Sequence, residues 1–170
     1  SMPESRALAL DRGKANGKGK IFRKVIYGDE LFFRTWSPEM AYVLGVLYTD
    51  GNVFPGKNNS LGLITTSTSP RISLWQKTPE LPLKVLNLMS CNATIFKRAR
   101  KEYATTTSGE TWGFVLNNAP MFDDLLKQGV YPNKSKTLSF PGQIPSQYFW
   151  HFIRGCWDGD GSISTPGTSI

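Results

Sequence analysis

The sequence contains two similar nine-residue segments, VLGVLYTDG at residues 43–51 and IRGCWDGDG at residues 153–161. Both carry glycine at the third place, aspartate at the eighth and glycine at the ninth. A motif that returns after a long interval indicates two copies of one structural unit within the chain.

Each segment covers the end of a predicted helix. Ser37 and Pro38 predict the beginning of the first, because serine caps a helix N-terminus and proline suits its first turn. The first helix is expected over residues 40–49 and the second over residues 147–158. Each would then end in a turn that contains Asp-Gly.

The repeated glycines, Gly45 and Gly155, indicate close helix packing. A glycine inside a helix costs about 1 kcal/mol relative to alanine, so its return at one motif position suggests a compensating role. Without a side chain, two helix backbones can approach each other closely. Two such helices lying side by side would bring Asp50 and Asp160 together at their C-terminal ends.

Such a pair of carboxylates points to metal chemistry. Neighbouring carboxylates raise each other's pKa, and the helix dipole disfavours negative charge at a C-terminus. A divalent cation relieves both effects, and Mg²⁺ prefers oxygen ligands. A metal held there can activate water and stabilise the leaving oxygen of a phosphodiester. The alternative is that Asp-Gly is only a turn after each helix, but the second copy favours a function.

Composition narrows the function further. The net charge is +7 and the pI is about 9.5, which is typical of proteins that bind a polyanion, although many basic proteins bind none. His151 is the single histidine, so a zinc site of several His and Cys ligands is excluded. The two cysteines form no disulfide framework, which favours a reducing, intracellular setting. No apolar run approaches the roughly 20 residues that span a bilayer, so no membrane partner is expected.

The chain between the two segments predicts an α+β unit. Together with the first helix, its pattern gives the order αββαββ and one further helix, after which the second motif helix follows. The elements expected after residue 50 are strands within 52–68, a helix at 80–90, strands at 93–104 and 111–118, and a helix at 119–127.

These features resemble the LAGLIDADG homing endonucleases. The two segments are similar to the two motifs of that family, and so are residues 36–45 and 131–137, which resemble intron-encoded or free-standing bacterial and phage members. The resemblance covers residues 32–164. It implies a site-specific endonuclease of a mobile genetic element that cleaves double-stranded DNA with Mg²⁺ or Mn²⁺. It also implies that the protein is located in the cytoplasm or nucleoid of a bacterium or of a phage-infected cell.

The resemblance assigns roles to particular residues. Asp50 and Asp160 would be catalytic and bind the metal, and Thr49 and Gly159 would supply backbone carbonyls. A basic residue near the site would assist the water or the scissile phosphate. The candidates for that role are Lys134 and Lys136. The alternative is that both lysines belong to a basic linker without a catalytic role.

The resemblance further implies that the antiparallel sheet of the αββαββ repeat binds DNA in the major groove. Strands can enter that groove, where all four base pairs are distinguishable. Residues 1–34 form a basic arm or a solvated tail, residues 35–145 the first repeat, and residues 146–170 the second motif helix and the beginning of another repeat. The candidate DNA contacts are Lys57, Lys97, Arg98, Arg100 and Lys101.

The sequence departs from the family pattern in two places. Tyr48 stands at the sixth motif place, where the family usually has aspartate. A second sheet would follow Asp160, so we expect a second half-domain or self-association to supply it, or the sequence to be a fragment. A regulator or RNA maturase of the same fold that binds without cleaving is the alternative function, and an intein-embedded enzyme is disfavoured. Expected in the core are Trp150, Trp157 and Cys156.

Overall fold

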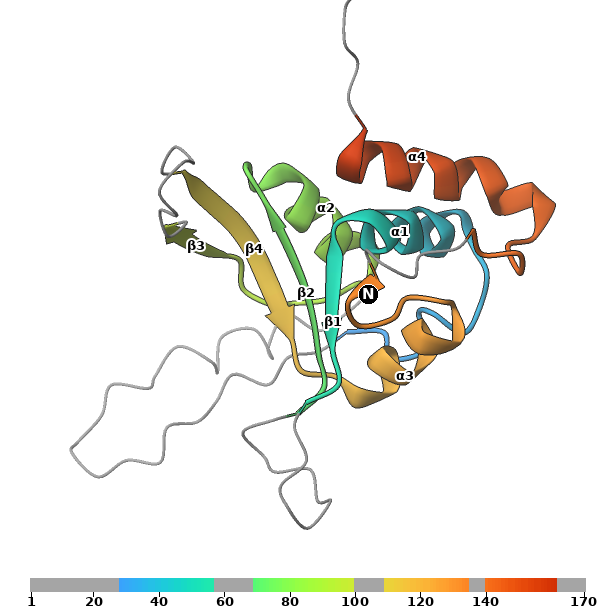
Figure 1. Cartoon of the computed structure of the whole chain (residues 1–170), viewed down its shortest axis with the longest axis horizontal. Coiled ribbons are helices and arrows are strands. Elements are labelled where there is room, and N and C mark those ends of the chain that lie inside the picture. The colour runs from blue at the N-terminus through green and yellow to red at the C-terminus, as the bar shows by residue number, and fades with distance from the viewer. Residues whose placement is uncertain (1–27, 57–68, 100–108, 135–139, 162–170) are drawn as a thin grey trace, which may run out of the picture.

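The computed structural model describes residues 28–56, 69–99, 109–134 and 140–161. It is an α+β structure with a four-stranded antiparallel sheet of order β1-β2-β4-β3 (Figure 1). None of the helices in these ranges is long and apolar enough to cross a lipid bilayer. The elements are α1 (Pro38–Thr49), β1 (Gly51–Phe54), β2 (Arg71–Gln76), α2 (Glu80–Leu88), β3 (Phe96–Ala99), β4 (Glu110–Leu116), α3 (Ala119–Lys127), the 3₁₀ helix η4 (Ser146–Tyr148) and α4 (Phe149–Asp160).

Helix α1 is the centre of the core. Ser37 caps it as expected, with its hydroxyl accepting a 3.0 Å hydrogen bond from the backbone N–H of Met40. Every residue from Met40 to Tyr48 is buried, which is typical of a helix surrounded by other elements. The helix ends at Thr49 as predicted, but the expected turn is limited to the C-cap residue Asp50, because strand β1 begins directly after it at Gly51.

The sheet packs one face against the helices. Ile72 and Leu74 of β2 lie opposite Leu116 and Phe114 of β4, and all four side chains are buried in the core. Of the two strands predicted within residues 52–68, the first corresponds to β1, which pairs with β2 at Arg71–Gln76, a strand that the sequence pattern did not predict. Residues 57–68 lie outside the described part of the chain.

The remaining helices agree closely with the sequence pattern. Helix α3 spans Ala119–Lys127 as predicted and is followed by Gly129, whose φ of +88° suits glycine. Helix α2 also lies where it was expected. Helix α4 differs, because it begins after η4 and includes Gly159 and Asp160, which had been assigned to a turn. The rest of the expected second repeat, residues 162–170, lies outside the described part of the chain.

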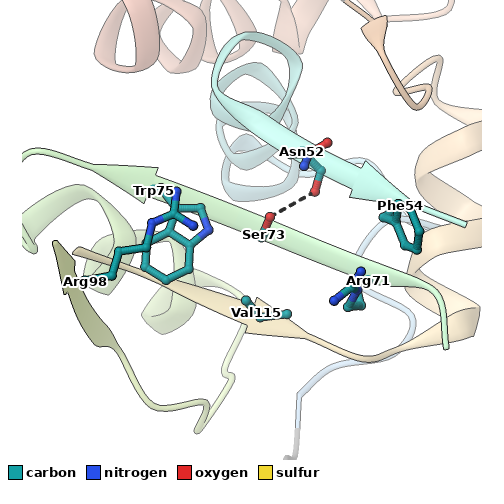
Figure 2. Close-up of a pocket in the computed structure, with 7 residues that line it drawn as sticks. All are labelled: Asn52, Phe54, Arg71, Ser73, Trp75, Arg98 and Val115. Atoms are coloured by element: carbon teal, nitrogen blue, oxygen red, sulfur yellow. Dashed lines mark hydrogen bonds between the residues drawn. The ribbon is translucent and has the colours of Figure 1, made fainter. Parts of the chain in front are cut away.

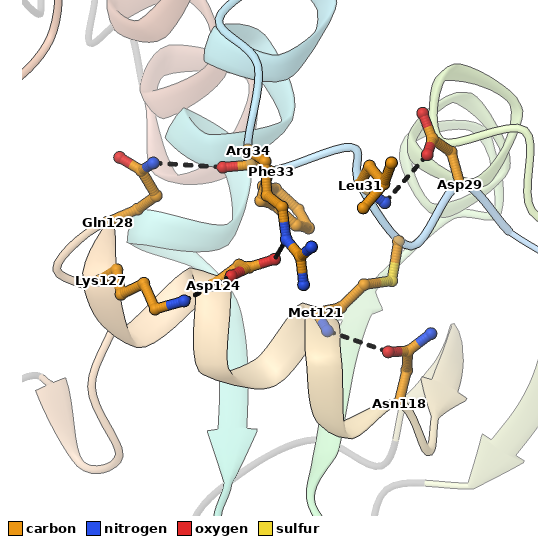
Figure 3. A network of polar contacts seen from close by, with 9 residues as sticks. All are labelled: Asp29, Leu31, Phe33, Arg34, Asn118, Met121, Asp124, Lys127 and Gln128. Atoms are coloured by element: carbon orange, nitrogen blue, oxygen red, sulfur yellow. Dashed lines mark hydrogen bonds and ion pairs between the residues drawn. The ribbon is translucent and has the colours of Figure 1, made fainter.

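An ionic cluster fixes the segment before α1 to α3 (Figure 3). Asp124 is 3% exposed and accepts hydrogen bonds from Arg34 Nε at 2.7 Å and Lys127 Nζ at 2.9 Å. Gln128 Nε2 also donates to the carbonyl of Phe33, whose ring is buried in the core. Residues 28–34, which the sequence had assigned to the basic arm, therefore include part of the folded core.

The cluster also sets the ionisation of Asp124. Burial alone would raise the pKa of this carboxyl, but the hydrogen bonds and charges of Arg34 and Lys127 outweigh it and lower the pKa below its ordinary value of 3.8. Because the folded pKa is depressed, the carboxylate contributes stability above the ordinary pKa. That contribution is lost as the pH falls through the folded pKa.

We predict that Asp124→Asn lowers the free energy of unfolding by about 1–2 kcal/mol at pH 7, since it removes two charge-assisted hydrogen bonds from partly exposed cations. It should also flatten the loss of stability below pH 4. Urea denaturation as a function of pH measures both effects. The neighbouring exposed Asp123→Asn is the control, and an equal effect of the two variants would contradict the assignment.

Candidate active site

Helices α1 and α4 lie side by side, with their C-terminal ends on the same side of the molecule (Figure 1). Glycines lie at their closest approach. A Cβ atom on Gly45 would collide with the carbonyl oxygen of Phe152, and one on Gly155 would collide with the carbonyl oxygen of Tyr42. Backbone atoms cannot swing away as a side chain can, so both positions require glycine for this helix separation.

The contact continues to the ends of the helices. A Cβ atom on Gly159 would collide with the hydroxyl oxygen of Thr49. That hydroxyl donates to backbone carbonyls of its own helix, at 3.1 Å to Val46 and 3.3 Å to Gly45. Thr49 and Gly159 therefore lie together at the last turn of both helices, next to Asp50 and Asp160, and their role in metal binding stays a prediction.

Asp50 and Asp160 interact electrostatically. Asp50 is the C-cap of α1 and Asp160 the last residue of α4. Burial raises the pKa of the half-buried Asp50 carboxyl, and repulsion from Asp160 raises it further. A hydrogen bond from Gln76 and the charge of Lys134 act in the opposite direction, and the net shift of the pKa is upward.

Lys134 is the basic residue of this site. Its ammonium donates to the backbone carbonyl of Gly51, the residue that follows Asp50. Burial lowers the pKa of this lysine, while attraction to Asp50 partly offsets the effect. The structure thus places one of the two candidate lysines beside the carboxylates. Lys136 lies outside the described residues.

Gln76 is a site residue that the sequence analysis missed. Its Nε2 donates to Oδ2 of Asp50 at 2.5 Å, from the last position of β2. Gln76 follows Ile72 and Leu74 on alternate positions of the strand, so it points to the same face as these buried residues. A polar residue in that alternation was the available signal, but no strand had been predicted over residues 71–76.

The residues at the helix ends fit a hard divalent cation. Two carboxylates converge where the charge of one raises the pKa of the other, and a cation would relieve that repulsion. Within the described ranges, no group of three or more His, Cys, Asp or Glu side chains converges. A cation that keeps several waters, such as Mg²⁺, needs few protein ligands, so Asp50 and Asp160 suffice as anchors.

Asp158, the acid at the sixth place of the second motif, has a structural role. Asp158 accepts a 2.5 Å hydrogen bond from the hydroxyl of Tyr42 and forms a 3.3 Å ion pair with Lys84. It therefore ties α4 to α1 and α2. Tyr48, its counterpart in the first segment, is buried and packs edge-to-face on Phe152 at 5.4 Å, which explains why an acid is absent there.

The basic residues of β3 lie on different faces of the sheet. Lys97 is opposite Trp112 and forms a 2.6 Å ion pair with Glu110, whereas Arg98 is opposite Thr111 on the face away from the helices. Of the candidate DNA contacts, Arg98 thus lies on the open face and Lys97 does not. Lys57, Arg100 and Lys101 lie outside the described residues.

Two tryptophans of α4 contradict the sequence prediction. Trp150 is 74% exposed and Trp157 is 56% exposed, so neither belongs to the core. They are seven residues apart and therefore share one face of α4. Cys156, in contrast, is half-buried, and burial raises the pKa of its thiol to about 11, so it acts as a small apolar side chain.

The sequence matches no model of a known protein family, and a search among characterised proteins finds no significant relative.

We predict that Gly45→Ala lowers the free energy of unfolding by about 1–3 kcal/mol, because the new methyl group forces the helices apart. This outweighs the gain of about 1 kcal/mol that alanine gives inside a helix. Chemical denaturation measures the change. Gly142→Ala is the control, since nothing lies within 4 Å of a Cβ atom at that position. A stabilised Gly45→Ala variant would show that the helices are not in close contact.

We also predict that Asp160→Asn lowers the pKa of Asp50, because the repelling charge is removed. Titration of the Asp50 carboxyl carbon by NMR, without metal, measures the shift. Asp123→Asn is the control for a remote charge. An unchanged pKa of Asp50 in the Asp160→Asn variant would mean that the two carboxylates do not interact.

Proposed function

We propose that the chain is a site-specific, metal-dependent DNA endonuclease of the LAGLIDADG type. The observation that carries this proposal is the convergence of Asp50 and Asp160 at the ends of two glycine-packed helices. Gln76 and Lys134 complete the arrangement. The two carboxylates have no evident structural need to lie there, because two like charges at helix C-termini oppose folding.

Each residue has a task in phosphodiester hydrolysis. Asp50 and Asp160 would hold Mg²⁺ or Mn²⁺, which when bound lowers the pKa of water and stabilises charge on the phosphate. Gln76 fixes the orientation of the Asp50 carboxylate through its hydrogen bond. Lys134 places positive charge beside the scissile phosphate. Burial lowers the pKa of Lys134, which makes its ammonium group a better proton donor than that of a free lysine.

The open face of the sheet is the proposed DNA surface. It carries Arg71 and Arg98 and begins at the active site, since β1 follows Asp50 directly. The net charge of +7 favours a polyanion, and antiparallel strands can enter the major groove. A duplex seated on this face would pass the helix ends, where the two carboxylates lie.

The exposed face of α4 is the proposed contact with a second half-domain. Helix α1 is covered on every side, whereas α4 exposes Trp150 and Trp157. If α4 repeats the role of α1, as its motif suggests, another sheet would cover these tryptophans. That half is supplied by further polypeptide or by self-association, and it would extend the DNA contact on the other side of the helix pair.

A cleavage selection on a pool of random duplexes tests the proposal. With Mg²⁺ the chain should enrich cuts within one long motif, and Asp160→Asn should not. Binding without cleavage by the wild-type chain would favour the alternative, a DNA-binding regulator or RNA maturase of this fold, or an inactive fragment. Neither binding nor cleavage would reject both readings.

On the enriched target, we predict that Asp50→Asn and Asp160→Asn each reduce the cleavage rate by at least about 10²-fold, comparable with the loss of one transition-state contact. Affinity for the duplex should change only a few-fold, because neither residue lies on the open face. Single-turnover kinetics and gel-shift titrations separate the two effects. Asp123→Asn is the control for the change of charge.

A further inference from the structure

The open face of the sheet carries a groove with two arginines stacked on aromatic rings (Figure 2). The guanidinium carbon of Arg98 lies 3.8 Å from the centre of the Trp75 ring, and that of Arg71 lies 4.6 Å from the centre of the Phe54 ring. Stacking on a ring restrains the plane of the guanidinium group and gives it a fixed orientation.

Gly113 makes the Trp75 platform possible. It lies on β4 directly opposite Trp75, and a Cβ atom there would collide with both the backbone and the indole ring of that strand. Trp75 is therefore able to lie over β4. Arg98, from the edge strand β3, reaches across the glycine position onto this ring and points toward the middle of the sheet.

Neither arginine forms an ion pair with a residue that the structure describes. Within the described ranges, the ion pairs involve Arg34, Lys84, Lys97 and Lys127, and none involves Arg71 or Arg98. The Nε of Arg98 donates to the hydroxyl of Thr111 at 3.3 Å. That bond leaves the two terminal nitrogens of the guanidinium group as a fork for an external pair of acceptors.

We infer that Arg98 and Arg71 are specificity-determining residues that each bind one guanine in the major groove of the DNA target. This inference rests on the proposed DNA-binding function. Guanine presents O6 and N7 as adjacent acceptors in that groove, and arginine binds both at once. The aromatic rings orient each guanidinium group for this paired contact. Beside them, the hydroxyl of Ser73 on β2 donates a hydrogen bond to the backbone carbonyl of Asn52 on β1.

A phosphate offers a similar pair of acceptor oxygens. The direction of Arg98 favours the base, because a strand ribbon in the major groove presents its middle to base edges and its rim to phosphates. Arg98 comes from an edge strand but leans inward to β2. Arg71 belongs to β2 itself, which is an inner strand of the sheet.

The positions of the two arginines also predict the spacing of the guanines. Arg71 and Trp75 are four residues apart on β2, which corresponds to about 13 Å along a strand. Base pairs follow one another at about 3.4 Å along the duplex, so the two guanines should lie about four base pairs apart. They can lie on either strand of the DNA.

Selection of bound sequences from a random duplex pool, with the full chain and without divalent metal, tests this inference separately from cleavage. The wild-type motif should contain two guanines about four base pairs apart. Arg98→Ala should reduce the preference for one of them by at least about fivefold, and Arg71→Ala that for the other. Arg98→Lys should do the same with little loss of total affinity, because lysine keeps the charge but not the fork.

Lys97→Ala is the matched control, since it removes the same charge from the other face of β3, and it should retain both guanines. Uniform weakening of all sequences by Arg98→Ala, with a shallower salt dependence, would assign Arg98 to phosphate and overturn the inference. A wild-type motif without guanine would also overturn it. Absence of any duplex binding by the wild-type chain would reject the proposed function as well, whereas failure to cut a guanine-containing motif would reject only the nuclease.

Discussion

The backbones of α1 and α4 are in close contact, and this contact determines where the two carboxylates lie. Gly45 and Gly155 allow two backbones to touch where any side chain would collide with a carbonyl group. Because the helices run in the same direction, this contact places both C-terminal ends together, and with them Asp50 and Asp160. The electrostatic conflict between these carboxylates is a consequence of the packing, and a divalent cation is the simplest way to relieve it.

The same contact links the proposed chemistry to the sheet. Strand β1 begins directly after Asp50, and Gln76 at the end of β2 binds the Asp50 carboxylate. The strands that would contact DNA are therefore joined, by a covalent bond and a hydrogen bond, to the residue that would hold the metal. Asp158, bound to Tyr42 and Lys84, fixes the position of α4 against the same framework.

Much of the fold could be predicted from sequence because the signals are local. Ser37 and Pro38 mark the beginning of α1, and the apolar residues of β4 mark a strand. The predictions fail where the position of a residue depends on contacts between segments that are distant in the sequence. Gln76 is recognised only once β2 is placed beside β1, and the faces of Lys97 and Arg98 depend on strand register. Trp150 and Trp157 were assigned to the core because they are apolar, but burial depends on a covering element that the described chain does not provide.

Titration of the full chain with Mn²⁺, followed by electron paramagnetic resonance, tests whether Asp50 and Asp160 bind one cation together. We expect one Mn²⁺ site. Asp50→Asn and Asp160→Asn should each weaken its affinity for Mn²⁺ at least about tenfold, as expected for the loss of a ligand carboxylate. Asp123→Asn should leave that affinity unchanged. Loss of Mn²⁺ binding in only one of the two variants, or in neither, would contradict the shared site at the ends of the paired helices.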